Sequence, residues 1–254
     1  MKNISVLLFL LITLALNAQN NKTSGLNARQ FHKYWKVESE SPDYKVTFLG
    51  DTVEILSPKG LTLWRKEKMS GKVTIEYDAC VVVEVEGDRL SDLNCFWMAS
   101  DPQYPDNIWK REKWRSGIFL NCYSLQLYYM GYGGNHNSTT RFRRYDGNEA
   151  AITNAKARPA ILKEYTDADH LLEANKWYHI KITNENNRVS YYINGVRLVD
   201  FRDADPLTEG WFGFRTTLSR TRIANFHYEC SSQEISEIPL HWIGDTPQQD
   251  RTVS

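Results

Sequence analysis

The sequence has little of what marks several large classes of protein. Lys plus Arg equals Asp plus Glu at 31 residues each, so there is no basic excess of the kind that binds nucleic acid or an anionic membrane. No Cys-x-x-Cys pair is present, and neither is a G-x-S-x-G elbow, an H-E-x-x-H motif or a phosphate-binding loop. We therefore predict no metal, no cofactor, and no nucleic-acid or membrane partner.

Cysteines are few and widely separated. Cys80, Cys95, Cys122 and Cys230 each lie within a strand-like run of residues. This placement predicts buried free thiols, although one disulfide stays possible if the protein reaches an oxidising compartment.

A long apolar run occurs at the N-terminus. Lys2 precedes the run from Ile4 to Leu16, and Asn17-Ala18-Gln19 follows it. This order is typical of a secretory signal peptide and is too short for a comfortable membrane span. We predict a signal peptide at 1–18, one domain at 19–230 and a tail at 231–254, with export to the periplasm or the medium.

Sustained helical periodicity is also lacking, whereas alternation of apolar and polar residues is common. The pairs Gly50-Asp51 and Asn194-Gly195 each separate two alternating runs, which is typical of tight hairpins. Turn signals at regular spacing favour an all-β sandwich of two antiparallel sheets without long helices.

The last third resembles a known superfamily. It contains WYHIKI (Trp177–Ile182), YYINGV (Tyr191–Val196), GWFGF (Gly210–Phe214) and IANF (Ile223–Phe226). These runs resemble the concanavalin A-like jelly-roll superfamily over roughly residues 30–230. The resemblance implies a jelly-roll β-sandwich in which one curved sheet forms a groove for sugar chains.

One segment looks unlike a core strand. Met130–Gly147 holds glycines, amides, a histidine and three arginines, with few aliphatic side chains. Arginine binds a carboxylate through two parallel hydrogen bonds, and histidine or tyrosine can exchange the proton beside it. We therefore assign His136 and Tyr132 to proton transfer and Arg143 to a uronate carboxylate. Residues expected to contact the rest of the substrate are Asn94, Trp97, Arg115, Asn135, Arg141 and Arg215.

The same segment permits plainer interpretations. Arg141 and Arg143 can be surface charges paired with acids, and the glycines can form only a turn. We expect Arg143 to face the groove with at least one of Asn94, Arg115 or Arg215.

A closer resemblance concerns function. DLNCFWMASDP (Asp92–Pro102), YGGNHNSTTRFRRYDG (Tyr132–Gly147) and GWFGFRTTLSRTR (Gly210–Arg222) resemble exported Bacteroidetes proteins of polysaccharide utilisation, including an ulvan oligosaccharide dehydratase type. The resemblance implies β-elimination on uronic-acid-containing oligosaccharides, by a dehydratase or a lyase. The alternatives are a non-catalytic lectin-like module and a glycoside hydrolase of the same fold.

Overall fold

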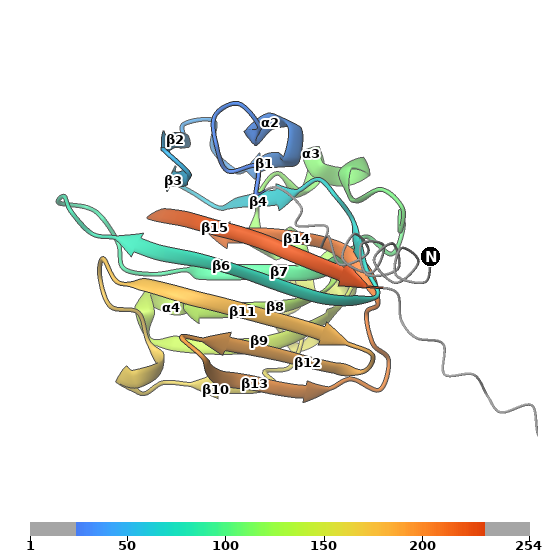
Figure 1. Ribbon diagram of the computed structural model, residues 1–254. Helices are drawn as coiled ribbons and strands as arrows, with labels where there is room; N and C mark the ends of the chain where they lie inside the picture. The colour runs from blue at the N-terminus through green and yellow to red at the C-terminus, as the bar shows by residue number, and fades with distance from the viewer. Residues whose placement is uncertain (1–23, 232–254) are drawn as a thin grey trace, which may run out of the picture.

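Two antiparallel sheets face each other in residues 24–231, the part of the chain that the computed structural model describes (Figure 1). The β8 sheet contains, in spatial order, β1 (Trp35–Ser39), β4 (Leu61–Arg65), β14 (Glu209–Thr216), β7 (Leu93–Ser100), β8 (Gln126–Gly133), β9 (Thr139–Asp146) and β10 (Lys163–Tyr165), with β5 (Met69–Ser70) beside β14. The β6 sheet contains β13 (Val196–Arg202), β12 (Arg188–Ile193), β11 (Trp177–Glu185), β6 (Lys72–Val82), β15 (Ser219–Ser231), β3 (Thr52–Ser57) and β2 (Lys45–Leu49). The predicted two-sheet sandwich is confirmed.

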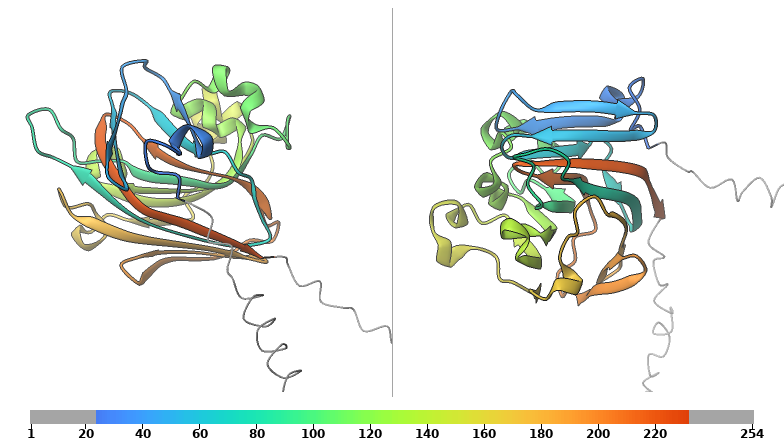
Figure 2. Two further views of the ribbon diagram at one scale, coloured as in Figure 1. Left: turned by 45° about the horizontal axis from the view of Figure 1, so that its top comes forward. Right: turned by 90° about the vertical axis from the view of Figure 1, so that its left-hand side faces the viewer.

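Helical segments in the described residues are short, as expected. They are α2 (Phe31–Tyr34), η1 (Ile108–Arg111), α3 (Glu112–Arg115), η2 (Phe119–Ser124), α4 (Gly134–Asn137), α5 (Ala150–Thr153), η3 (Ala155–Ala157) and η4 (Ala168–His170). The green segment carrying η1, α3 and η2 lies over the outer side of the β8 sheet (Figure 2). None of these helices has the length and apolar character needed to cross a membrane.

Both hairpins that the sequence predicts are present. Leu49 pairs with Thr52 across Gly50-Asp51, and Ile193 pairs with Val196 across Asn194-Gly195. The predicted signal peptide (1–18) and the tail beyond Ser231, where β15 ends, lie outside the described residues.

The space between the sheets is filled largely by aromatic rings. Trp97 of the β8 sheet stacks on Tyr191 of the β6 sheet with ring centroids 6.2 Å apart, and on Phe142 at 5.9 Å. Near β1, Phe226 packs on Trp35 at 4.8 Å. Such pairs each add about 0.5–1.5 kcal/mol beyond the burial of apolar area. This core fixes which side chains of the β8 sheet face outward.

The cysteines are free thiols, and three of the four are buried. Burial raises the pKa of Cys95 to about 12 and that of Cys122 to about 11, and it also raises the pKa of Cys80. Cys230 is exposed, so the expectation of burial is wrong for this residue, which lies near the end of β15.

These environments predict the thiol chemistry of the native protein. A thiol-reactive aromatic disulfide should modify one thiol, Cys230, at pH 8, because buried protonated thiols react slowly. All four should react after unfolding in guanidinium without reductant, as measured by released chromophore. Fewer than four thiols after unfolding would show that a disulfide forms.

Candidate functional site

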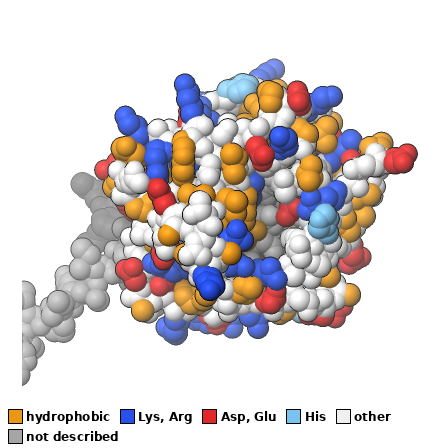
Figure 3. Space-filling model, turned by 180° about the vertical axis from the view of Figure 1, so that it is seen from behind, with side chains coloured by type: hydrophobic (Ala, Val, Ile, Leu, Met, Phe, Trp, Pro, Cys, Tyr) orange, Lys and Arg blue, Asp and Glu red, His pale blue; other side chains and the backbone are white. Residues whose placement is uncertain are grey.

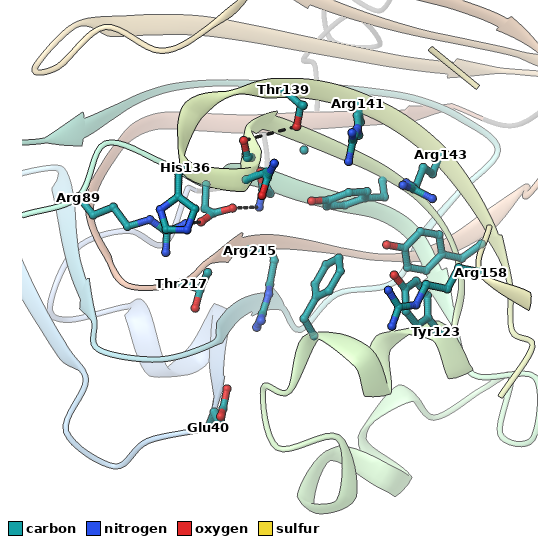
Figure 4. Close-up of a pocket in the computed structure, with 18 residues that line it drawn as sticks. Glu40, Arg89, Tyr123, His136, Thr139, Arg141, Arg143, Arg158, Arg215 and Thr217 are labelled. Atoms are coloured by element: carbon teal, nitrogen blue, oxygen red, sulfur yellow. Dashed lines mark hydrogen bonds and ion pairs between the residues drawn. The ribbon is translucent and has the colours of Figure 1, made fainter. Parts of the chain in front are cut away.

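A cavity of about 460 Å³ opens on the outer face of the β8 sheet. Strands β7, β8, β9 and β14 form its floor, and the segment carrying η2 lies along one side (Figure 4). The space-filling view shows a hollow near the centre of this face, with cationic side chains and a histidine at its rim (Figure 3). Five arginines line the cavity, against two carboxylates, Glu40 and Asp92. These arginines are Arg89, Arg141, Arg143, Arg158 and Arg215.

Strand alternation places the side chains on the floor of this cavity. In β9, Arg141, Arg143 and Tyr145 face the cavity, whereas Phe142 between them lies in the inter-sheet core. In β14, Phe214 packs in that core and Arg215 faces the cavity. Side chains in a strand alternate between the two faces, so burial of the phenylalanines forces the arginines outward.

Three of the five arginines have no carboxylate partner within 4 Å among the described residues. Arg215 donates from Nη1 to the carbonyl of Gly117 at 2.7 Å, and Arg143 donates to the carbonyl of Pro159. The guanidinium of Arg158 lies 5.8 Å from the ring centroid of Tyr123. None of the three is therefore neutralised by a salt bridge among the described residues, although the charge of Arg215 partly opposes the rise that burial causes in the pKa of the Glu38 carboxyl.

The other two arginines are neutralised. Arg89 pairs with Asp92 at 2.7 Å, and Arg141 pairs with Glu164 of β10. Asp92 also accepts a 3.2 Å hydrogen bond from the Asn94 amide nitrogen, which orients that side chain. The amide oxygen of Asn94 is buried and has no hydrogen-bond partner among the described residues.

Three tyrosines form one wall of the cavity. Tyr145 lies with its ring centroid 5.0 Å from Tyr123 and 5.7 Å from Tyr129. Burial and the nearby Asp92 raise the pKa of Tyr129, outweighing the opposite effects of Arg215 and Arg143. Tyr129 is therefore a neutral phenol at the cavity.

Gly131 makes room for the Tyr129 hydroxyl. A Cβ at Gly131 would lie 2.5 Å from the Tyr129 hydroxyl oxygen, closer than real contacts allow. The absence of a side chain at this position lets the tyrosine lie along the floor of the cavity.

The turn that carries His136 is strained. Asn135, His136 and Asn137 have φ values of 51°, 59° and 55°, three successive left-handed residues that are not glycine. Such residues each cost of order 1 kcal/mol and persist where neighbouring contacts hold them. Asn137 supplies those contacts through two hydrogen bonds of 2.8 Å. Its amide nitrogen donates to the carbonyl of Leu172, and its amide oxygen accepts from the backbone N–H of Leu172. His136 is thereby held, exposed, at the rim of the cavity.

The structure brings most of the predicted site residues together. Arg143, the one assigned to a carboxylate, lines the cavity with Asn94 and Arg215, as expected. His136 lines it too. The predicted contact residues Asn135 and Arg141 are also part of its lining. Their roles remain predictions.

The expected placement of Tyr132 is wrong. It is 2% exposed and packs between the sheets against Tyr178, with its hydroxyl donating 3.2 Å to the carbonyl of Leu171. Strand β8 continues to Gly133 instead of turning at Gly131, so Tyr132 falls on the core face. Burial raises its pKa, and its position in the core separates it from the cavity.

Trp97 and Arg115 are likewise outside the cavity. Trp97 is fully buried in the inter-sheet core, where it stacks on Tyr191. Arg115 is fully buried and pairs with Glu38 of β1 at 2.9 Å, which ties α3 to the β8 sheet. Both are architectural residues, and neither lines the cavity.

Several cavity residues were not among the site residues predicted from the sequence. Arg89, Arg158, Tyr123 and Tyr129 come from four separate segments, and only the fold brings them together. Of these four residues, only Tyr129 could have been predicted from local sequence, because it shares a strand face with Gly131. No cluster of three or more metal-ligating side chains occurs in residues 24–231.

The hydrogen bonds of Asn137 should be measurable as stability. Asn137→Ala loses both bonds to Leu172 as well as the tolerance of asparagine for positive φ, and we expect a loss of about 2 kcal/mol or more in urea unfolding. Asn186→Ala is the matched control. Asn186 has φ 52° in an exposed turn and makes no side-chain hydrogen bond among the described residues. Equal losses in the two variants would mean that the contacts to Leu172 contribute nothing.

Solved structures with similar folds are distant in sequence. One is a protein of unknown function with a galectin-like fold from Bacillus subtilis, with a TM-score of 0.64, 15% identity, and coverage of 82% of this chain and 94% of that chain. The mannose-bound exoplasmic/lumenal domain of VIP36 has a TM-score of 0.57 at 10% identity, with coverage of 94% and 99%. The alginate lyase Aly36B has a TM-score of 0.50 at 11% identity, with coverage of 86% and 95%. These likenesses support the jelly-roll architecture.

Comparison at the level of sequence gives the family. No match is found among curated proteins. A family model described as a domain of unknown function, DUF6250, matches residues 55–226, so the chain belongs to the DUF6250 family.

Proposed function

We propose that this protein catalyses β-elimination on oligosaccharides that contain a uronic acid, as a dehydratase or a lyase. The observation that carries the proposal is a group of three arginines in one cavity, Arg143, Arg158 and Arg215, that have no carboxylate partner within residues 24–231. A tyrosine and a histidine line the same cavity. This combination suits an anionic substrate that undergoes proton transfer.

The arginines would bind the uronate carboxylate. Removal of the proton at C5 of the sugar shifts negative charge onto that carboxylate in the transition state. Arg143 and Arg215 have free donors that can take this charge, and Asn94 adds a fixed amide beside them. Because the guanidinium groups are already in place, little reorganisation is needed during the reaction.

Two side chains would carry the protons. His136, exposed at the rim, accepts the C5 proton, and the electrons of that bond form the C4–C5 double bond as the C4–O bond breaks. Tyr129, which lines the cavity with its hydroxyl beside Gly131, donates its proton to the departing oxygen, so Tyr129 takes the role first assigned to Tyr132. The product that departs is water for a dehydratase and a sugar hydroxyl for a lyase.

The similar folds support carbohydrate as the ligand class. The alginate lyase Aly36B shares this architecture, as does the mannose-bound VIP36 domain. The VIP36 likeness favours a second candidate, a lectin-like module that binds the uronate without reacting. Export, suggested by residues 1–18, would bring either protein to polysaccharides outside the cytoplasm, with an ulvan-type chain as one substrate.

Elimination creates a conjugated unsaturated uronate that absorbs in the ultraviolet, and this absorbance allows a direct test. The protein should raise that absorbance when mixed with oligosaccharides prepared from ulvan or alginate. Arg143→Lys should lower kcat/KM by about 10- to 100-fold, because lysine keeps the charge but lacks the bidentate fork. Arg144→Lys, one residue along β9 on the opposite face, should stay near wild type. Binding without any change in absorbance would favour the lectin-like module.

The proton-transfer assignments can be tested with paired variants. Tyr129→Phe and His136→Ala should each lower kcat by about 10²–10⁴-fold, the usual contribution of one acid or base. Tyr132→Phe, on the same strand but in the core, should retain activity and lose about 1 kcal/mol of stability. Loss of activity in the Tyr132 variant with retention in the Tyr129 variant would reverse the assignment.

A further inference from the structure

A second cavity, of about 410 Å³, adjoins the first on the other side of Arg89. Arg89 lines both cavities, and Thr217 of the first is followed directly by Leu218 of the second. The two cavities therefore share a wall at Arg89. The remaining walls of the second cavity are Leu56, Ser57, Pro58, Gly87, Asp88 and Ser219.

The segment from Ala151 to Pro159 borders the opposite end of the first cavity. Ala151 of α5 is 1% exposed and packs in one cluster with Tyr123 and Tyr145. Pro159, farther along the same segment, accepts a hydrogen bond from Arg143. Arg89 and Arg158 lie at opposite ends of the site in Figure 4. A sugar chain that leaves the first cavity past Arg89 would enter the second cavity.

The second cavity has an apolar wall. Leu218 is 52% exposed and has φ of 50°, which is unusual for a bulky residue. Pro58 contributes further apolar surface. An apolar side chain exposed beside a binding site can pack against the C–H face of a sugar ring.

The charges of the second cavity are already balanced. Arg89 is paired with Asp92, and Arg220 lies 3.4 Å from Asp88 and 3.8 Å from Glu54. Asp88 also accepts hydrogen bonds from two backbone N–H groups, at 2.9 and 3.1 Å. No cation there resembles the three unpaired arginines of the first cavity, so a second carboxylate would gain little at this position.

We propose that the second cavity binds an uncharged sugar residue adjacent to the uronate in the same chain, with Leu218 as the specificity-determining contact. This inference rests on the proposed function, because the first cavity must hold the uronate. It identifies the substrate as a mixed chain in which a uronic acid is joined to a neutral sugar.

Calorimetric titration of the His136→Ala protein, in which turnover should be slowed about 10²–10⁴-fold, tests the subsite. The probes are methyl glucuronide, glucuronate joined to one xylose, and a diglucuronate. The xylose-containing disaccharide should bind about tenfold more tightly than methyl glucuronide, as expected for covering one apolar side chain, and the diglucuronate should gain less. Adding Leu218→Gly should abolish the gain and leave methyl glucuronide unchanged.

Leu218→Gly should fold, because glycine adopts positive φ without strain. Leu49→Gly is the matched control, since Leu49 is 48% exposed beside a different turn. Equal affinity for the disaccharide and methyl glucuronide, or equal weakening of both by Leu218→Gly, would overturn the subsite. Failure of all three probes to bind would instead overturn the uronate site itself.

Discussion

The alternation of side chains along β7, β8, β9 and β14 is the constraint on which the site depends. Each strand places one set of residues in an aromatic core and the other set on the outer face. Trp97 is held in the core by Tyr191 of the opposite sheet, and Phe142 by Phe201 of that sheet. A shift of one residue in β9 would put Arg143 into that core and Phe142 into solvent. The core between the sheets thus determines the register, and the register determines which charges line the cavity.

The cavity holds features that a purely structural surface would not need. Three arginines face one space without carboxylate partners among the described residues, although their mutual repulsion opposes folding. Three successive non-glycine residues take left-handed conformations beside them. Strain and unbalanced charge at one place are typical of a binding site, because a ligand offsets what the fold leaves unfavourable. The aromatic core and the two hydrogen bonds between Asn137 and Leu172 provide the compensating stability.

Much of this arrangement follows from local sequence. The turn residues Gly50-Asp51 and Asn194-Gly195 predict the two hairpins. In β14, alternation from the buried Phe212 and Phe214 predicts that Arg215 faces outward. The period of two also placed Arg143 on the same face as Arg141.

Other features depend on contacts that local sequence does not contain. Arg115 pairs with Glu38, which is 77 residues away in the sequence. An arginine that was predicted to contact the substrate is therefore part of a buried ion pair. Tyr132 was misplaced because the glycines around it suggested a turn, whereas pairing of β8 with β7 extends the strand through them. Arg89 and Arg158 reach the cavity from distant loops, and only the assembled sandwich brings them near Arg143.

A crystal structure with a bound uronate oligosaccharide would be the most direct measurement, using the His136→Ala protein so that the sugar stays intact. The carboxylate should lie in contact with at least one of the three unpaired guanidinium groups, those of Arg143, Arg158 and Arg215, with the sugar ring near Tyr129. A carboxylate bound on the β6 sheet, or held only beside Leu218, would contradict the assignment of this cavity as the uronate site.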